Sequence, residues 1–384
     1  MERRVVGKMV KKLPSWKNSP RDPHFLLLFM CQAFDLDVFL FTPDDVNYEQ
    51  GTINGQFFEH RKFCRKIVPI PPMIETWYEG LIDKRLVAAT DYCIYRRPRM
   101  NKQKTHDILS NTEFADNIIK TDSLNKSEQV FDVLKHTPDI VLKPIGDSNG
   151  EGVIRINVKG KKYVLNTENT DFFFKSRSAV VENQDTAEEC LGDPDMTLES
   201  FLGQYFKEFK NRIIVQPYIK CRTSNDEPFD VRVRVVKKRG GSNYAMQVFP
   251  RIGNKNGMRS NIHTGGYSLP ILTFLEQEFG TIDPLSPKAK AKAMLKDLEE
   301  TGTRLVEILQ KNAREGIIFD IGLDIGILRA DNDKGYKFVI FEANSYPSFS
   351  TCVALQNIYN GPQIPLAYLN FYNWIYDNKM PKKG

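Results

Sequence analysis

The stretch Ile140-Val-Leu-Lys-Pro-Ile-Gly-Asp-Ser-Asn-Gly-Glu-Gly-Val-Ile-Arg-Ile156 is the part of the chain around which the rest can be organised. Its apolar start ends at Lys143, a glycine-rich loop follows, and alternating residues resume up to Ile156, which predicts two strands joined by a flexible tip. Glycines let backbone N–H groups approach an anion, and Lys143 adds a positive charge at the strand end. The stretch therefore predicts either an ordinary hairpin or a lid over a polyphosphate.

Two familiar phosphate-binding motifs are absent from this stretch. No Gly-Lys-Ser/Thr follows the glycines and no helix is expected directly behind them, which excludes a P-loop. The glycines also lack the G-x-G-x-x-G order of a dinucleotide fingerprint. A phosphate-binding role for the hairpin therefore depends on residues elsewhere in the chain.

The composition is that of an ordinary soluble globular protein. The 384 residues are 41% hydrophobic and 27% charged, which suits two or three compact units. The net charge of +6 comes from 54 basic and 48 acidic residues, so an anionic ligand is favoured without any need for nucleic acid. The six cysteines form no C-x-x-C pair, the five histidines lack metal-ligand spacing, and the apolar run at residues 25–31 is too short to span a bilayer. These features predict a reduced, cytoplasmic protein.

The order of apolar and breaker residues predicts three units. Residues 1–98 are expected to form a small α/β domain, in which residues 1–22 are a basic extension or a short edge strand. Residues 99–215 are expected to form a lobe with the glycine-rich lid, and residues 216–384 a lobe with the later strands and C-terminal helices. Within the second unit, residues 167–196 have little regular pattern and predict a surface insertion of unknown role.

The densest basic run of the chain covers residues 96–104. Such a run is usually a solvated face, and the alternative is that part of it meets a phosphate or carboxylate. Nucleic-acid binding is a weaker alternative, because the run is joined by no aromatic residue beyond Tyr95.

The clearest alternation in the sequence lies between residues 229 and 236. A period of two places Asp230, Arg232 and Arg234 on one face of a strand and valines on the other. The charged face is either an outer surface or the wall of a cleft that holds anions. A partner strand follows after a glycine turn and ends near Arg251.

Two later apolar runs predict a hairpin that carries oxygen ligands. Asp324 lies on the first run and Glu342 and Asn344 on the second, where a spacing of two puts the latter pair on one face. Magnesium is usually held by one or two carboxylates together with phosphates and water. Burying these groups side by side without a counter-ion is costly, and a metal would remove that cost.

Together these stretches resemble the ATP-grasp ligases, and among them the YheC/YheD-like endospore coat-associated proteins. The resemblance covers about residues 95 to 350. It implies an α+β ATP-grasp fold, with two α+β lobes around the nucleotide and a small α/β domain before them. The matching stretches are Lys143-Pro144 with Gly146 to Gly152, Gln216-Pro217-Tyr218-Ile219, Phe229-Asp230-Val-Arg232, Arg259-Ser-Asn261-Ile-His263-Thr-Gly265-Gly266, Gly322-Leu-Asp324-Ile-Gly326 and Phe341-Glu342-Ala-Asn344-Ser-Tyr-Pro347.

The resemblance also implies roles for individual residues. Lys143 would contact the α- or β-phosphate, Arg251 the terminal phosphate or an acyl phosphate, and a further lysine is expected upstream, where Lys102 fits best by spacing and Lys104 is close behind. His263 would either assist the nucleophile or only form hydrogen bonds within its loop. The implied nucleotide-contacting residues are Lys102, Lys143, Gly146, Ser148, Asn149, Gly150, Gly152, Gln216, Pro217, Tyr218, Ile219 and Asp230; the implied catalytic residues are Arg232, Arg251, Arg259, Asn261 and His263; the implied metal ligands are Asp324, Glu342 and Asn344.

The function implied by this resemblance is an ATP- and Mg²⁺-dependent ligase that forms C–N bonds. ATP would activate a carboxylate as an acyl phosphate, which an amine attacks, with two magnesium ions expected and manganese as an alternative. Its partners would be a small-molecule or peptide carboxylate and an amine nucleophile. The alternative is a structural, coat-associated protein that binds nucleotide without turnover.

Overall fold

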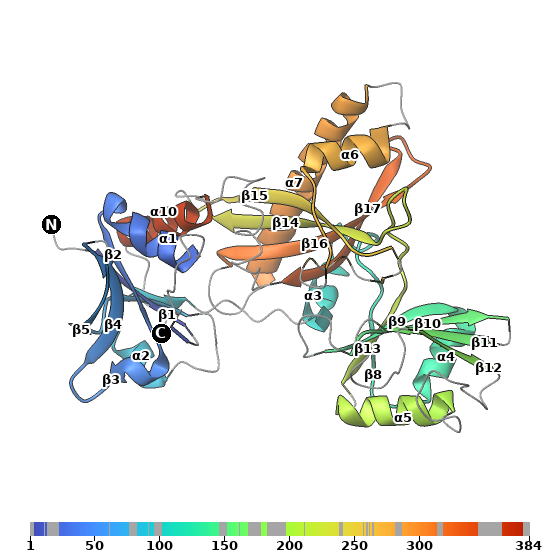
Figure 1. Ribbon diagram of the computed structural model, residues 1–384, viewed down its shortest axis with the longest axis horizontal. Coiled ribbons are helices and arrows are strands. Elements are labelled where there is room, and N and C mark those ends of the chain that lie inside the picture. Colours follow the sequence, from blue (N-terminus) through green and yellow to red (C-terminus); the bar gives the residue numbers. More distant parts are fainter. Residues whose placement is uncertain are drawn as a thin grey trace.

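The computed structural model has an α+β architecture built on three sheets (Figure 1). Among the described residues, no helix is long and apolar enough to cross a membrane. The structure describes residues 4–10, 12–13, 23–60, 62–76, 83–90, 92–95, 102–145, 152–160, 162–167, 178–182, 197–210, 212–237, 241–255, 257–258, 260, 262, 265–280, 286–312, 318–344 and 363–378.

The N-terminal part of the chain forms a seven-stranded sheet in the order β3-β4-β2-β1-β6-β7, with β5 paired to β4. β1 pairs in parallel with β2 on one side and β6 on the other. The expectation of an extension or edge strand is therefore wrong for residues 4–9, since β1 is an interior strand. The strands are β1 (Arg4–Met9), β2 (Leu36–Phe41), β3 (Val46–Asn47), β4 (Thr52–Glu59), β5 (Lys62–Pro69), β6 (Met73–Thr76) and β7 (Tyr92–Tyr95), and the helices are α1 (Pro23–Met30), the 3-10 turns η1 (Cys31–Phe34) and η2 (Pro43–Asp45), and α2 (Lys84–Ala88).

The C-terminal helix α10 (Gln363–Asn378) packs against α1 and shares a buried core with β1 and β2. Figure 1 shows this helix, in red, lying over the blue N-terminal sheet. The two ends of the described chain thus stabilise one another through apolar burial. The predicted boundaries at residues 98 and 215 stay a prediction.

The glycine-rich stretch belongs to a six-stranded sheet in the order β12-β11-β10-β9-β13-β8. Its hairpin pairs β9 with β10, with Leu142 opposite Ile154, as the sequence predicts. Part of the predicted insertion forms β12, which pairs with β11, so the expectation of an unpatterned segment is wrong for those residues. Helices α4 and α5 cover one face around a common core. The elements are β8 (Asp122–Leu124), α4 (Gln129–His136), β9 (Asp139–Pro144), β10 (Ile154–Lys159), β11 (Lys162–Thr167), β12 (Ser178–Glu182), α5 (Leu198–Glu208) and β13 (Ile213–Pro217).

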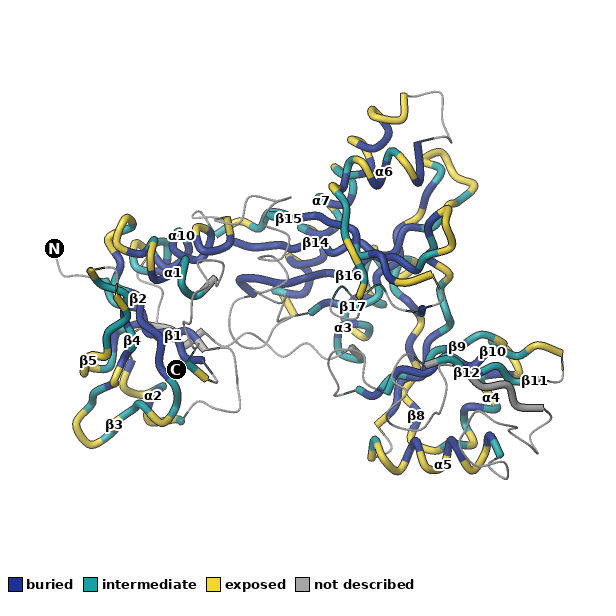
Figure 2. The backbone as a smooth tube through the Cα atoms, viewed as in Figure 1, coloured by how far each residue is buried: buried dark blue, intermediate teal, exposed yellow. Residues whose placement is uncertain are grey.

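The charged alternation and the predicted hairpin meet in a four-stranded antiparallel sheet in the order β15-β14-β16-β17. Val231, Val233 and Val235 pack into the core shared with α6 and α7, which leaves the charged residues on the opposite face. Those residues are themselves buried, so the outer-surface interpretation is wrong (Figure 2). The elements are β14 (Phe229–Lys237), β15 (Asn243–Ile252), α6 (Ile271–Phe279), α7 (Pro287–Asn312), β16 (Asp320–Arg329) and β17 (Tyr336–Asn344).

The segment from residue 102 to residue 121 connects the four-stranded sheet with the six-stranded sheet. Helix α3 (Lys102–Leu109) packs against α7 and β17, and the residues after it run beside β17. The Ile340 amide donates to Asn117 O at 2.8 Å, and Ile118 bridges Ile340 in parallel. The chain then enters β8 at the edge of the six-stranded sheet. The segment therefore brings that edge close to the strand that carries Glu342.

Candidate functional site

A row of charged side chains crosses the four-stranded sheet on the face opposite α7. The antiparallel register places Arg251 opposite Asp230, Arg232 opposite Asp324, and Asp324 opposite Glu342. Residues directly opposite one another in antiparallel strands point to the same face, so the five side chains form one continuous line. We call these five residues the charged row.

Asp324 lies near the middle of the charged row and is engaged by two arginines. Arg232 forms a two-pronged ion pair with it, through Nε to Oδ1 and through Nη2 to Oδ2 at 3.0 Å, and Arg251 Nη2 lies 2.8 Å from Oδ2. The Asp324 residue is only 4% exposed. Burial raises the pKa of Asp324, but the charges of Arg232 and Arg251 outweigh burial and hold that pKa below its ordinary value. The carboxylate is therefore ionised and held in place.

Arg251 bridges two aspartates. Its Nε donates to Asp230 Oδ1 at 2.6 Å and its Nη2 donates to Asp230 Oδ2 at 2.5 Å, in addition to the bond to Asp324. Ser260 Oγ donates to the same Asp230 at 2.7 Å. Burial lowers the pKa of Arg251, but the two carboxylates outweigh burial and leave the pKa above its ordinary value. The guanidinium is therefore a fixed positive charge with a set orientation.

A second buried pair supports the charged row from one side. Arg234 binds Asp320 through Nε to Oδ1 at 2.9 Å and through Nη2 to Oδ2, and both residues are 1% exposed. Tyr368 Oη on α10 donates to Asp320 at 3.0 Å. Asp320 is therefore part of the framework that supports the charged row. It also joins the C-terminal helix to the sheet of the charged row.

The three expected metal ligands lie on neighbouring strands. Glu342 is opposite Asp324 and Asn344 is opposite Gly322, and both Glu342 and Asn344 are partly exposed on the edge strand β17. Two carboxylates and one amide oxygen are the donor types that magnesium prefers, so the set fits a hard cation. Within the described ranges no group of three or more His, Cys, Asp or Glu side chains has a metal-binding arrangement. A metal is not the only group that can offset the charge of Asp324, because the guanidinium groups of Arg232 and Arg251 already do so in this structure.

Lys143 lies on the face of the six-stranded sheet that α4 and α5 leave uncovered. Leu142 and Val215 are in the helix-covered core, so the alternating residues Lys143 and Ile214, which are register partners, point the other way. Gly152 ends the glycine-rich stretch with φ at +68°, and Tyr205 Oη donates to its carbonyl at 2.6 Å. The other lid residues, Gly146, Ser148, Asn149 and Gly150, lie outside the described residues.

The expected nucleotide-contacting residues 216–219, which we call the hinge, join the two sheets. Gln216 and Pro217 end β13, and Ile219 packs against the core of the four-stranded sheet. The Tyr218 amide donates to Asp139 O at 2.9 Å, and the Arg155 guanidinium lies 3.6 Å from the centre of the Tyr218 ring. Asp139 in turn holds Arg155 through two bonds of 2.8 and 2.6 Å. The hinge is thus fixed by two residues that the sequence did not single out.

The remaining expected residues divide into two groups. Lys102 begins α3, and its neighbour Gln103 accepts a hydrogen bond from Ser123 Oγ at 2.8 Å, which holds that helix against the edge of the six-stranded sheet. Arg259, Asn261 and His263 lie outside the described residues.

Arg222 was not predicted to belong to the site. Its guanidinium donates to the carbonyls of Lys255 at 2.9 Å and Gly257 at 2.8 Å, and so holds the start of the loop that leads to Arg259.

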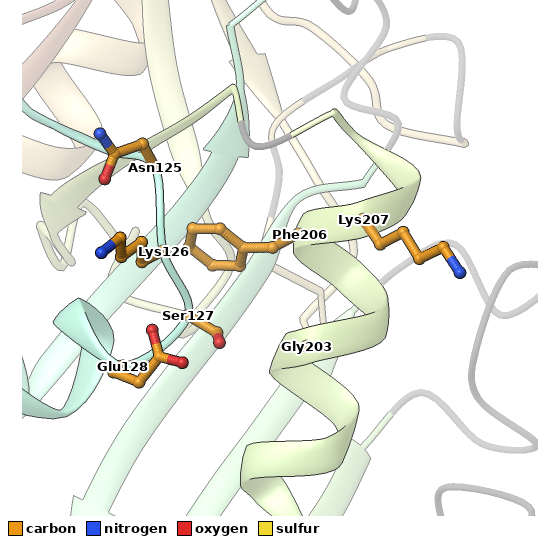
Figure 3. A pocket seen from close by; sticks show the side chains of 7 residues that line it. All are labelled: Asn125, Lys126, Ser127, Glu128, Gly203, Phe206 and Lys207. Carbon is orange, nitrogen blue, oxygen red and sulfur yellow. The ribbon is translucent and has the colours of Figure 1, made fainter.

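A separate hollow of about 500 Å³ lies on the helix-covered side of the six-stranded sheet (Figure 3). It contains none of the expected site residues and faces away from Lys143. We therefore place the candidate site at the charged row and not here. The hollow is lined by Asn125, Lys126, Ser127, Glu128, Gly203, Phe206 and Lys207.

The comparisons with known proteins agree on one family. A model of the YheC/D-like ATP-grasp family matches residues 93–371. Two curated proteins of Bacillus subtilis (strain 168) are similar: endospore coat-associated protein YheD is 23% identical over 328 residues, covering 81% of this chain and 64% of its own, and endospore coat-associated protein YheC is 23% identical over 242 residues, covering 63% and 58%. The chain thus spans less than two thirds of either relative.

Two ligases are among the solved structures that are similar to this chain. A RiPP-associated ATP-grasp ligase of Chryseobacterium gregarium, solved with ADP and a leader and core peptide, has a TM-score of 0.46 at 12% identity and covers 99% of both chains. The D-alanine-D-alanine ligase of Coxiella burnetii has a TM-score of 0.47 at 9% identity and covers 98% of both. The family match spans well over half of the chain. The predicted α+β ATP-grasp fold is confirmed, and the chain belongs to the YheC/D-like ATP-grasp family.

Proposed function

We propose that this chain is an ATP- and Mg²⁺-dependent ligase that joins a carboxylate to an amine through an acyl phosphate. The observation that carries the proposal is the arrangement of Arg232 and Arg251 on Asp324, directly beside Glu342. It combines fixed cationic side chains with oxygen ligands for a hard cation. Phosphoryl transfer needs little more from a protein than such positioning and charge stabilisation.

The reaction would proceed in two displacements. An oxygen of the substrate carboxylate attacks the γ-phosphorus, and the bond from that phosphorus to the β,γ-bridging oxygen breaks to release ADP. The amine nitrogen then attacks the acyl carbon, phosphate leaves with the electron pair of the C–O bond, and the nitrogen loses a proton. Asp324, Glu342 and Asn344 would hold magnesium, which supplies neutralisation of phosphate charge when bound.

The chain's own residues would keep the reacting groups in line. Asp230 holds Arg251 through two bonds, so we assign Asp230 the positioning of that guanidinium in place of direct nucleotide contact. If Asp324 turns toward a cation, the Arg251 nitrogen that it now holds is released toward the terminal phosphate while Asp230 keeps the group oriented. Arg232 would bind the substrate carboxylate once Asp324 has turned away from it, together with Arg259, because a guanidinium matches a carboxylate with two parallel bonds.

The nucleotide would lie between the two sheets. Lys143 would meet the α- or β-phosphate under the glycine-rich lid, with Lys102 from α3 as a further contact and residues 216–219 along the base. The segment that pairs with Ile340 brings the hinge edge toward Glu342, which supports a single site built from both sheets.

A second candidate rests on the relatives. Both curated relatives are named endospore coat-associated proteins, and that name describes an association and no reaction. In this alternative the chain binds ATP and Mg²⁺ as part of an assembly without turnover.

The cytoplasmic location expected from the sequence stays a prediction.

ADP release from purified protein separates the two candidates. A ligase should release ADP only with Mg²⁺ and an added pool of amino acids and peptides, and Asp324→Asn or Glu342→Gln should abolish the release. The exposed Asp331 lies in the turn between the same two strands, so Asp331→Asn is a matched control that should keep full activity. Tight ATP binding without ADP release across the pool favours the second candidate. Full activity in Asp324→Asn would refute the assignment of Asp324 as a metal ligand.

A further inference from the structure

Strand β17 contains one extra residue beside the charged row. Ile325 on β16 lies opposite Ile340, but its neighbour Asp324 lies opposite Glu342. Phe341 is therefore the inserted residue of a β-bulge, in which two residues of β17 oppose the single Asp324. Bulges of this kind are frequent next to active sites, where they change the direction of a side chain.

The bulge determines which face of the sheet carries Glu342. In a regular ladder Glu342 would lie opposite Leu323, whose side chain belongs to the core beside α7. Ala343 takes that place instead, and it is buried in the same core. The inserted residue thus brings Glu342 to the face of Asp324, where the charged row lies.

Phe341 packs on Gly326 of the neighbouring strand. Gly326 and Asp324 are two apart on β16, so position 326 faces the same side as the charged row. A Cβ added to Gly326 would lie 2.6 Å from Cζ of the Phe341 ring and 2.6 Å from Cys221 Sγ. The ring and the thiol therefore fill the space that a side chain at position 326 would need. Glycine lets the residue next to Glu342 pack directly on the backbone of β16.

We infer that Phe341, packed on Gly326, is the positioning residue that orients Glu342 toward the metal. The inference rests on the proposed function, in which Glu342 holds magnesium. Magnesium requires near-octahedral geometry with ligands at about 2.0–2.1 Å, whereas calcium accepts variable geometry at about 2.3–2.6 Å. A small displacement of Glu342 should therefore weaken the binding of magnesium more than the binding of calcium.

Gly326→Ala tests this expectation, because the added methyl group must displace the Phe341 ring. Isothermal titration calorimetry would measure the affinity for AMP-PNP, an ATP analogue that resists hydrolysis, in Mg²⁺, in Ca²⁺ and in EDTA. The affinity in Mg²⁺ should fall about tenfold or more, and the affinity in Ca²⁺ by no more than about threefold. The affinity in EDTA should not change, since Glu342 acts only through the metal. Equal losses under the three conditions would indicate a general disturbance of the nucleotide site and would overturn the inference.

Gly302→Ala is the matched control on the other face of the same sheet. A Cβ added to Gly302 on α7 would lie 2.6 Å from Val233 Cγ1, as close as the added Cβ at position 326 lies to the Phe341 ring. Gly302→Ala should lower the melting temperature through overpacking and leave all three AMP-PNP affinities unchanged. A selective loss in Mg²⁺ in this variant too would contradict the role of Phe341.

Phe341→Leu tests the same role without adding an atom. It removes the ring that packs on Gly326 and should also weaken AMP-PNP in Mg²⁺ more than in Ca²⁺. In the double variant Gly326→Ala/Phe341→Leu the methyl group enters space that the ring has left. The loss in Mg²⁺ should therefore be smaller than the product of the two single losses. Losses that multiply would show that Gly326 does not act through Phe341.

Glu342→Gln separates this inference from the proposed function. In the proposed site it should remove the gain in AMP-PNP affinity that Mg²⁺ provides. If Glu342→Gln loses that gain while Gly326→Ala and Phe341→Leu keep the wild-type affinity in Mg²⁺, the inference is wrong and the metal site stands. If Mg²⁺ does not strengthen AMP-PNP binding to the wild type, the metal assignment fails and the inference fails with it.

Discussion

Arg251 on β15 reaches across the whole of β14 to Asp324 on β16, with Nη2 2.8 Å from Oδ2. The contact joins two strands that are not neighbours in the sheet. The contact places the Arg251 guanidinium against the carboxylate that we assign to the metal. Arg251 can therefore bind either Asp324 or a phosphate. Arg251 is also tied to Asp230, which keeps its plane fixed in either arrangement.

Replacing Arg251 by lysine should separate charge from geometry. Arg251→Lys keeps the positive charge but lacks the planar fork that binds Asp230 through two nitrogens, so turnover should fall at least about tenfold while ATP affinity changes less. Steady-state kcat and a separate measurement of ATP affinity would show this. Arg304→Lys, at an exposed pair with Glu113, should be neutral. An unchanged kcat in Arg251→Lys would show that turnover does not need the two-nitrogen contact of the guanidinium with Asp230.

The pair of Arg234 and Asp320 should matter for folding. Both residues are buried, so Asp320→Asn leaves a guanidinium without its full counter-charge and should lower the free energy of unfolding by about 3–5 kcal/mol. Tyr368→Phe removes one hydrogen bond to Asp320 and should cost about 1 kcal/mol. Urea unfolding measures both, and the exposed Asp331→Asn should stay within about 0.5 kcal/mol of the wild type. A loss below 1 kcal/mol in Asp320→Asn would contradict this interpretation.

Gly152 should be needed for two physical reasons. Its φ of +68° strains any other residue, and an added Cβ would lie 2.4 Å from the Phe209 ring and 2.8 Å from Pro144. Gly152→Ala should therefore lower the free energy of unfolding by about 2–4 kcal/mol, the sum of backbone strain and overpacking. Gly160 has φ at +63° with open space around it, so Gly160→Ala isolates the strain and should cost about 1–2 kcal/mol. Equal losses in both variants would exclude the packing contribution.

Local patterns in the sequence predict much of this fold. The alternation at β14 and the two apolar runs of β16 and β17 each carry a short-range signal, and the structure follows them. The same period of two placed Asp230, Arg232 and Arg234 on one face. It could not show that the face is buried, because the residues that neutralise it lie 21 to 92 positions away in the sequence.

Contacts distant in sequence account for what the patterns missed. The basic residues among the first 22 positions suggested an extension or an edge strand, yet Lys8 in β1 is fully buried and its Nζ lies 2.5 Å from Glu75 Oε2. Thr121 belongs to no recognisable sequence motif. The pairing of β8 with β13 brings it within hydrogen-bond distance of Gln216. In each case a polar residue is explained by a partner that no local window contains.

His24 should make the stability of the N-terminal sheet depend on pH. The residue is partly buried overall, but its Nδ1 is enclosed; burial and then the charge of Lys8 lower the pKa of His24 to about 3, against the opposing charge of Glu75. The unfolded chain binds the proton near pH 6.5, so the folded state is favoured above that pH and loses stability as the pH falls toward 3. By pH 5 the loss should be about 2 kcal/mol.

Thermal unfolding between pH 7.5 and pH 5 measures this loss. His24→Gln replaces the imidazole by a side chain that does not titrate, so the difference between the two pH values should shrink relative to the wild type. His136→Gln, at an exposed position on α4, is the control and should retain the wild-type pH dependence. If His24→Gln and the wild type lose the same stability between pH 7.5 and pH 5, the imidazole is not the group that the folded protein keeps neutral.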